Sequence, residues 1–442
     1  MEFVDIRYPF DNFISFVSGG YFLALESLHL TLGVIGFFFI SIYLLYTLRL
    51  KFALLIIYFG GSIYSNPTFE SFGVSFAEFV GIINSIIFII TLMSRRTILS
   101  KTSKLLFSIL FIITAHVLLV WFFYPELIDN VEKAVFRGVL ILKIFVLACN
   151  VGMLAIVVRN KKRLGLFLQW VIVYLSFSAA LYIMQLIEYN LFSIEPFGTF
   201  SNAGFSSGVS FGSVATERGH YAKFLVPAIP LVMYRIFCFT PILFEKIRFG
   251  VYFLVCVINF SASGIAFLLS YILAFSLVFW REIVKKYLFW FLATVLIVFP
   301  LTVYLLFEQY MSIVNKIIEY VFSDEASGGR KLSTIANYLN VYPLGITYGG
   351  SSLRTIESIG PVELGLIGLV TQFSIFLLIF AVLITKYLLN VGFFCRKKNA
   401  GDKILFCGII ISLFIFVSDI LWFLPIIWCQ YQMYENRELY RK

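Results

Sequence analysis

Long uninterrupted apolar runs constrain this chain more than any other feature. A helix needs about 20 apolar residues to cross the hydrocarbon core of a bilayer. Candidate runs fall at 29–48, 52–66, 73–94, 104–123, 138–158, 164–188, 221–241, 249–261, 263–280, 287–307, 361–386 and 403–432. Hydrophobic residues make up 61% of the chain and charged residues only 13%, against about 25% charged in a soluble domain. The sequence therefore predicts an all-α, polytopic membrane protein.

The number of spans depends on how the ambiguous runs are read. The run 52–66 is short, and 249–261 with 263–280 could form one broken element. Residues 1–28 form either an interfacial helix or one further span. We expect about 11–14 transmembrane helices in a single integral membrane domain that covers residues 1–442.

The last run, 403–432, is too long for an ordinary span and carries Asp419 near its middle. Two short helices that form a hairpin explain both features better than one helix does. The hairpin returns the basic tail ENRELYRK to the side from which the run starts, whereas a single span would leave it on the opposite side.

Basic residues gather in alternate loops, which sets the orientation. Because loops rich in Lys and Arg stay in the cytoplasm, the cytoplasmic clusters are Arg49/Lys51, Arg95/Arg96/Lys101/Lys104, Arg159/Lys161/Lys162/Arg163, Lys246/Arg248, Arg281/Lys285/Lys286 and Arg396/Lys397/Lys398. The two longest loops, 189–220 and 308–360, then lie on the opposite face. Long loops held by a rigid scaffold often carry binding sites.

The net charge of +10 would suggest nucleic acid as a partner in a soluble protein. Here the positive-inside rule explains the charge, so we expect no nucleic-acid partner. The six cysteines lie in or beside apolar runs without a CxxC motif or a Cys/His pairing, which argues against a zinc site. His29 and His116 are interpreted as isolated helix histidines without a role.

The first polar stretch that could take part in a reaction is 212–230, GSVATERGHYAKFLVPAIP. Glu217, Arg218 and His220 stand just before an apolar run, next to the free backbone N–H groups of a helix start. A carboxylate or an imidazole in that position is suited to general acid–base work on a substrate hydroxyl. The alternative is that the three residues only solvate the start of the helix.

The second polar stretch, 323–361, contains Arg330 after SDEASGG and Arg354 after GITYGGSS. A guanidinium group binds phosphate through a planar fork of donors that stays charged. The glycines around both arginines would let backbone N–H groups approach an anion, although they match no phosphate-loop motif. The alternative is that the arginines only keep the loop soluble.

Four segments, taken in order, resemble the O-antigen polymerase family, which is related to the O-antigen ligases and to other bacterial polysaccharide polymerases. They are TERGHYAKFLVP, NFSASGIAFLLSYIL, GGRKLSTIANYLNVYPLGITYGG and VELGLIGLVTQF. Together they cover about residues 200–380, and the N-terminal half is similar to the family only as generic apolar helices.

The resemblance implies a GT-C-type membrane glycosyltransferase on the periplasmic face of the bacterial inner membrane. Such an enzyme joins undecaprenyl-diphosphate-linked oligosaccharide repeat units without a nucleotide sugar, a metal ion or another cofactor. Its implied partners are membrane lipids and a chain-length regulator. On this chain the resemblance makes Glu217 or His220 the base. It makes Arg330 the first diphosphate-binding residue, followed by Arg354 and Arg218.

One departure separates this chain from the ligase branch, which places a His shortly before its closing helix. Here Arg354 precedes Glu363 in that position and no His is near, which favours a polymerase over an O-antigen ligase. A lipid-linked oligosaccharide flippase is the alternative from another class. Because a flippase would spread charges over several helices, the concentration of polar residues in two loops on one face favours an enzyme.

Overall fold

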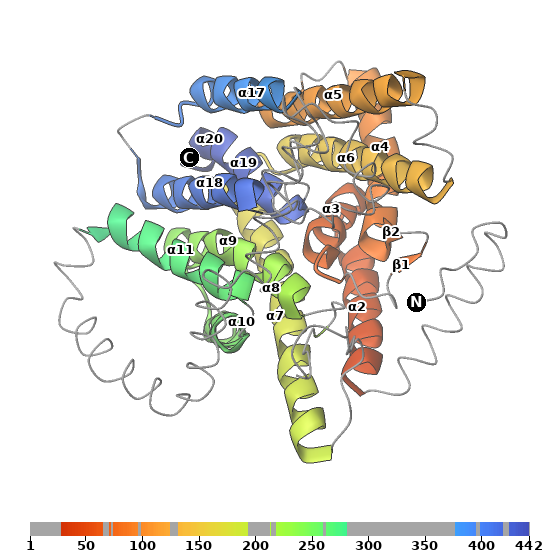
Figure 1. The fold of residues 1–442 in the computed structure, drawn as a ribbon. Helices are drawn as coiled ribbons and strands as arrows, with labels where there is room; N and C mark the ends of the chain where they lie inside the picture. The colour runs from red at the N-terminus through yellow and green to blue at the C-terminus, as the bar shows by residue number, and fades with distance from the viewer. Residues whose placement is uncertain are drawn as a thin grey trace, which may run out of the picture.

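The structure is a computed structural model that describes residues 28–64, 70–71, 74–95, 99–123, 131–192, 213, 218–259, 262–280, 376–394, 398–418 and 424–441. Across these residues the chain is helical, apart from a hairpin of two-residue strands, as the all-α prediction requires (Figure 1). The strands are β1 (Glu70–Ser71) and β2 (Val74–Ser75), which pair antiparallel with Ser71 opposite Val74.

The first half of the chain forms the longer helices. They are α2 (Leu28–Thr47), α3 (Leu50–Gly61), α4 (Phe76–Arg95), α5 (Lys101–Phe123), α6 (Val131–Val157) and α7 (Lys161–Phe192). α7 and α2 stand side by side in Figure 1, and α7 also packs on α3, α9 and α10. At 32 residues α7 is about 48 Å long, so it links opposite ends of the structure.

The second half contains shorter helices. They are α8 (Arg218–Leu225), the 3₁₀ turn η3 (Val226–Ala228), α9 (Ile229–Cys238), α10 (Leu243–Ile258), α11 (Ala262–Val278), α17 (Phe376–Asn390), α18 (Ala400–Ser418), α19 (Pro425–Glu435) and α20 (Arg437–Arg441). The ambiguous runs 249–261 and 263–280 are therefore two separate helices, α10 and α11. The expected span 287–307 lies outside the described residues.

Several helices have the length and composition of membrane spans. Among the described residues, three stretches are long and apolar enough to cross a bilayer, namely Phe76–Ser94, Lys161–Tyr189 and Tyr221–Cys238. Large apolar side chains also face outward: Phe39 and Tyr46 on α2 are 69% and 89% exposed, and Met93 on α4 is 80% exposed. Soluble proteins rarely present such surfaces, so the exteriors of these helices suit lipid.

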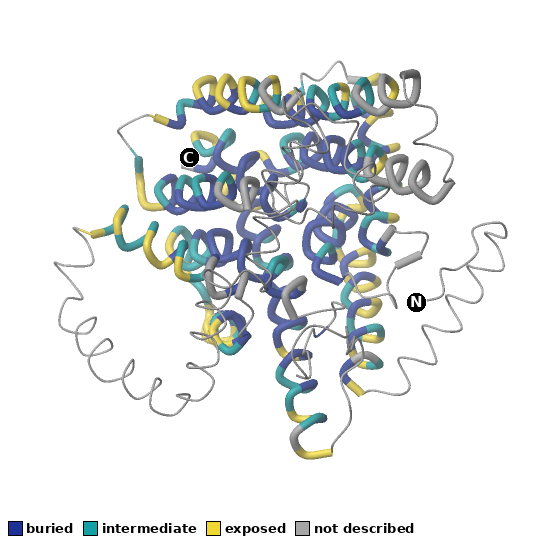
Figure 2. Tube along the Cα trace, in the orientation of Figure 1, coloured by how far each residue is buried: buried dark blue, intermediate teal, exposed yellow. Residues whose placement is uncertain are grey.

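The interior is formed by helices that are buried on most sides. Figure 2 shows α3, α19 and the middle of α7 in the buried colour, surrounded by helices with exposed outer faces. Polar residues also hold neighbouring helices such as α4 and α6 together. For example, the Asn84 side chain donates to Asn150 Oδ1 (2.7 Å), and Asn150 donates to the carbonyl of Gly81 (3.0 Å). Hydrogen bonds of this kind are common between apolar helices that pack in membranes.

The end of the chain forms the expected hairpin. α18 and α19 pack against each other, and Tyr434 near the end of α19 lies beside Phe393, which shortly precedes the start of α18. The two helices therefore run in opposite directions, as predicted for 403–432. Asp419, proposed for the tip of the hairpin, lies outside the described residues.

Several helix ends meet at what we call the basic end, defined by Lys101, Val158, Asn390, Glu435 and Tyr440. Lys101 Nζ donates to the carbonyl of Asn390 (2.7 Å), and the Tyr440 hydroxyl donates to the carbonyl of Val158 (3.1 Å). The starts of α5 and α7 and the ends of α6, α17 and α19 therefore share this end. Lys101, Arg159 and Lys161 lie at this end, and the expected sidedness of the basic loops stays a prediction.

Candidate functional site

Most of the predicted site residues lie outside the described part of the chain. This is so for Glu217, Arg330 and Arg354, and for nearly all of the loops 189–220 and 308–360. Arg218 and His220 belong to the first turn of α8, where the backbone is described and the side chains are not. The convergence of the five residues thus remains a prediction.

The two ends of the stretch around Glu217 are nevertheless bound to one helix. Ser213 donates through its backbone N–H to Gln185 Oε1 (2.8 Å) and through its hydroxyl to the carbonyl of Ser178 (3.0 Å). Ser178 Oγ in turn donates to the Tyr221 hydroxyl (3.1 Å). Because Ser178 and Gln185 both belong to α7, the residues that bracket 214–220 are fixed against the second half of α7.

Ser213 and Tyr221 are held by more than these hydrogen bonds. Ser213 has a φ of 54°, a left-handed conformation that is uncommon for a residue other than glycine, and its two bonds to α7 stabilise it there. The Tyr221 ring stacks on Tyr182 of α7, with centroids 5.5 Å apart and an interplanar angle of 9°. The start of α8 therefore has a defined position beside α7.

The expected helix 221–241 is present as a helical stretch from Tyr221 to Cys238, with a break in its α-helical winding at η3 that the sequence analysis did not predict. Pro227 and Pro230 lack backbone N–H groups, and the chain passes from α8 through η3 into α9. Other helices bind the carbonyls at the break: Tyr252 donates to Leu225 O and Gln430 Nε2 donates to Pro227 O, both at 2.6 Å. Hydrogen bonds to backbone groups that lack a helical partner make such a change of winding possible inside a membrane.

A buried imidazole–carboxylate pair lies near the end of α7. Glu188 Oε1 accepts the backbone N–H of His29 (2.6 Å), and Glu188 Oε2 lies 2.5 Å from His29 Nδ1. Both residues are buried, with exposed fractions of 1% for His29 and 4% for Glu188. The interpretation of His29 as an isolated helix histidine is therefore wrong, because Glu188 binds its ring and also caps the start of α2.

Two nitrogen atoms of these residues have no partner among the residues that the structure describes. They are His29 Nε2 and Gln185 Nε2, and both are buried. Gln185 and Glu188 are three residues apart on α7, so their side chains lie on the same side of the helix, about 5–6 Å apart at Cβ. We refer to His29, Gln185, Glu188, Ser213 and Tyr221 as the α7 cluster. Its unpartnered atoms lie on the same half of α7 as the two anchors of the predicted site stretch.

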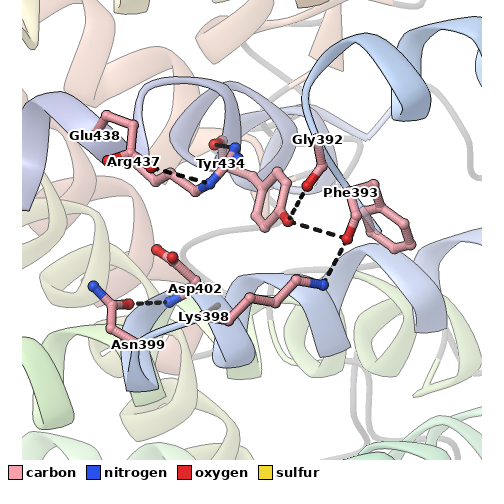
Figure 3. Close-up of polar contacts among 8 residues, drawn as sticks. All are labelled: Gly392, Phe393, Lys398, Asn399, Asp402, Tyr434, Arg437 and Glu438. Carbon is pink, nitrogen blue, oxygen red and sulfur yellow. Dashed lines mark hydrogen bonds and ion pairs between the residues drawn. The ribbon is translucent and has the colours of Figure 1, made fainter. Parts of the chain in front are cut away.

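The basic end contains polar groups of a different kind. Figure 3 shows the Tyr434 hydroxyl against the carbonyls of Gly392 and Phe393, with Lys398 Nζ donating to Phe393 O (2.6 Å). Asn399 Oδ1 accepts the backbone N–H of Asp402 and caps α18 (2.8 Å). These contacts join helix ends to one another, so this region is a structural junction.

Within the part of the chain that the structure describes, no three His, Cys, Asp or Glu side chains come close enough together to hold a metal ion. No protein-family model matches the chain, and no curated protein or solved structure matches it. The functional argument therefore depends on the residues of this chain and on the arrangement of its helices.

Sequence reasoning missed the pairing of His29 with Glu188. The two residues are 159 positions apart, and no local pattern joins them. One signal was available: His29 stands at the start of the expected span 29–48 and Glu188 at the end of 164–188. Because spans alternate in direction, both residues fall at the face where the loop 189–220 was expected.

Proposed function

We propose that the protein is a polysaccharide (O-antigen) polymerase, a glycosyltransferase that joins undecaprenyl-diphosphate-linked repeat units on the periplasmic face of the inner membrane. The proposal includes a GT-C-type fold with about 11–14 spans and the two large periplasmic loops 189–220 and 308–360. The order of the four family-like segments over residues 200–380 supports it, as does the apolar exterior of the described helices.

The observation that carries the proposal is the attachment of Ser213 and Tyr221 to the second half of α7. Glu217, Arg218 and His220 lie between these two anchors. Gln185 is roughly 36 Å along α7 from Lys161 at the basic end, calculated from a rise of 1.5 Å per residue. This separation is close to the thickness of a bilayer core, which supports placing the polar stretch on the face opposite the basic loops.

In the proposed reaction a hydroxyl of the acceptor sugar attacks the anomeric carbon of the donor glycan. The bond from that carbon to the diphosphate breaks, and the diphosphate leaves with the electron pair. Arg330, with Arg354 and Arg218, would stabilise the charge that grows on the leaving group. A base must take the proton of the acceptor hydroxyl, and the family resemblance nominates Glu217 or His220 for this role.

A deletion strain tests the function directly. We expect loss of long polysaccharide chains while single repeat units remain attached to lipid A core, with long chains restored by the wild-type gene. A strain without attached repeat units would instead indicate a flippase or a ligase. The flippase is the second candidate because the break between α8 and α9 resembles the discontinuous helices of transporter binding sites.

The diphosphate-binding role is tested by Arg330→Ala, which should abolish long chains at normal expression. Arg330→Lys retains the charge but loses the fork of donors, so it should restore little activity. The control is Arg159→Ala, which removes an exposed arginine from the basic end and should leave the chains at wild-type length. A full ladder from Arg330→Ala would remove this residue from the mechanism.

A further inference from the structure

The α7 cluster offers hydrogen-bonding capacity that its own residues do not use. Both Glu188 oxygens face nitrogen atoms of His29, so the ring proton lies on Nδ1 and the lone pair lies on Nε2. Gln185 Oε1 already accepts from Ser213, which identifies the other terminal atom of the amide as its NH₂ group. One buried acceptor, His29 Nε2, and one buried donor, Gln185 Nε2, are thus unpartnered.

This combination selects the chemistry of a ligand. A hydroxyl group can both donate and accept a hydrogen bond, so hydroxyl groups of a ligand match the acceptor and the donor. An anion would meet the lone pair of His29 and the carboxylate of Glu188, which repel it. Leaving both polar atoms buried without a partner is unfavourable, so the cluster is suited to a bound hydroxyl.

On the basis of the function proposed above, we infer that the α7 cluster binds the acceptor sugar and that His29 is the base of the reaction. His29 Nε2 takes the proton from the acceptor hydroxyl as its oxygen bonds to the anomeric carbon and the diphosphate leaves. The imidazolium that forms faces the Glu188 carboxylate, which stabilises it until the proton passes to water. Gln185 holds the hydroxyl oxygen, and Glu188 is a positioning residue that sets the tautomer.

The arrangement also prepares His29 geometrically for proton transfer. The carboxylate holds the ring in one tautomer and one orientation, so little reorganisation is needed during proton transfer. A second bond from Glu188 to the backbone N–H of His29 fixes the residue at the start of α2. A positioned base contributes about 10²–10⁴-fold to a rate, so its removal should be easily measured.

The test compares variants that keep the contact between α2 and α7. In His29→Asn, the side-chain amide replaces Nδ1 as a donor to Glu188 while the Nε2 position is lost. In Glu188→Gln, the amide donates to Nδ1 and forces the ring proton onto Nε2, so the base is lost although the shape is kept. Each variant, expressed in the deletion strain, should elongate chains about 100-fold or more slowly than wild type. The control, His116→Asn on α5, should elongate them normally.

A spectroscopic measurement tests the tautomer on which this role depends. The protein contains three histidines, so nitrogen-15 labelling of histidine gives few signals. We expect the Nδ1–H tautomer for His29 in the wild type and the Nε2–H tautomer in Glu188→Gln. If both variants fail to fold, the tautomer of the wild type still tests the assignment. An Nε2–H ring would overturn it, because such a ring cannot act as a base at this position.

The possible outcomes test the assignment of His29 separately from the proposed polymerase function. A deletion strain that keeps its long chains overturns the polymerase proposal and this assignment together. Long chains that are lost on deletion but restored fully by His29→Asn overturn the assignment alone, and the buried atoms then hold water. If Glu217→Gln or His220→Ala stops elongation while His29→Asn does not, the base lies in the 214–220 stretch instead.

Discussion

The two ends of α7 are both polar, yet they use polar groups in different ways. At the basic end, both oxygens of Glu435 cap α5 by accepting the backbone N–H groups of Lys101 and Thr102, and Oε2 also accepts the Thr102 hydroxyl (2.7–2.8 Å). At the other end, both oxygens of Glu188 accept from one histidine, whose second ring nitrogen has no partner in the described part of the chain. Glu435 only joins helix ends, whereas Glu188 caps α2 and also orients an imidazole, which we propose serves a ligand.

The environment of the basic end is consistent with its structural role. The Tyr440 hydroxyl donates to the carbonyl of Val158, and burial raises the pKa of this phenol well above its usual range. Close by on the same side of the bundle, Arg235 binds both oxygens of Glu245 (2.8 and 3.1 Å) and lies over the Phe239 ring at 4.8 Å. These contacts fasten α20 to the loop between α6 and α7, and α9 to α10.

The largest predicted effect concerns the sidedness of the two ends of α7. In a background without native cysteines, Lys162→Cys should react with an impermeant thiol reagent only from the cytoplasmic side. Leu191→Cys, which replaces a 72% exposed residue, should react only from the periplasmic side. The labelling of intact cells and of inverted vesicles measures this difference. Reaction of both cysteines from one side would show that α7 does not cross the membrane.

A large loss of stability should follow when the carboxylate is removed from the α7 cluster. Glu188→Leu leaves a buried ring N–H and the backbone N–H of His29 without an acceptor, and breaking a buried pair in this way costs about 3–5 kcal/mol. The thermal aggregation of the detergent-solubilised protein measures the loss. Glu188→Gln is the matched control and should melt closer to wild type. Equal melting of Glu188→Leu and wild type would mean that water or lipid reaches the pair.

Sequence reasoning recovered the features that depend on local composition. The all-α class was predicted from the apolar runs, and the hairpin at 403–432 was predicted from its length and from Asp419. The break within 221–241 was missed, although Pro227 and Pro230 signal it, because high apolarity favours a continuous span. The His29–Glu188 pair was missed because it depends on the packing of α2 against α7, which no local pattern encodes.

The middle of α7 should be the next most sensitive region, since it holds both ends in register. A Cβ added at Gly60 of α3 would lie 2.5 Å from Tyr174 Cδ2 and 3.2 Å from Tyr174 Cβ, so the ring cannot simply turn away. Gly60→Ala should therefore cost about 1–3 kcal/mol through overpacking, despite the better helix propensity of alanine. Gly250→Ala is the control, because nothing lies within 4 Å of its added Cβ, and it should be neutral or slightly stabilising. A variant Gly60→Ala as stable as Gly250→Ala would show that α3 and α7 are loosely packed.

The smallest effect is expected at Glu435, and it bears most directly on the difference between the two ends. Glu435→Ala removes the cap of α5, which should cost about 0.5–2 kcal/mol. Because this carboxylate serves only helix ends, the variant should melt earlier than wild type yet restore long chains fully in the deletion strain. His29→Asn should show the reverse, with little change in melting and a large loss of elongation. If Glu435→Ala also stopped elongation at normal expression, the basic end would contribute to the reaction, and the division between a structural end and a functional end would fail.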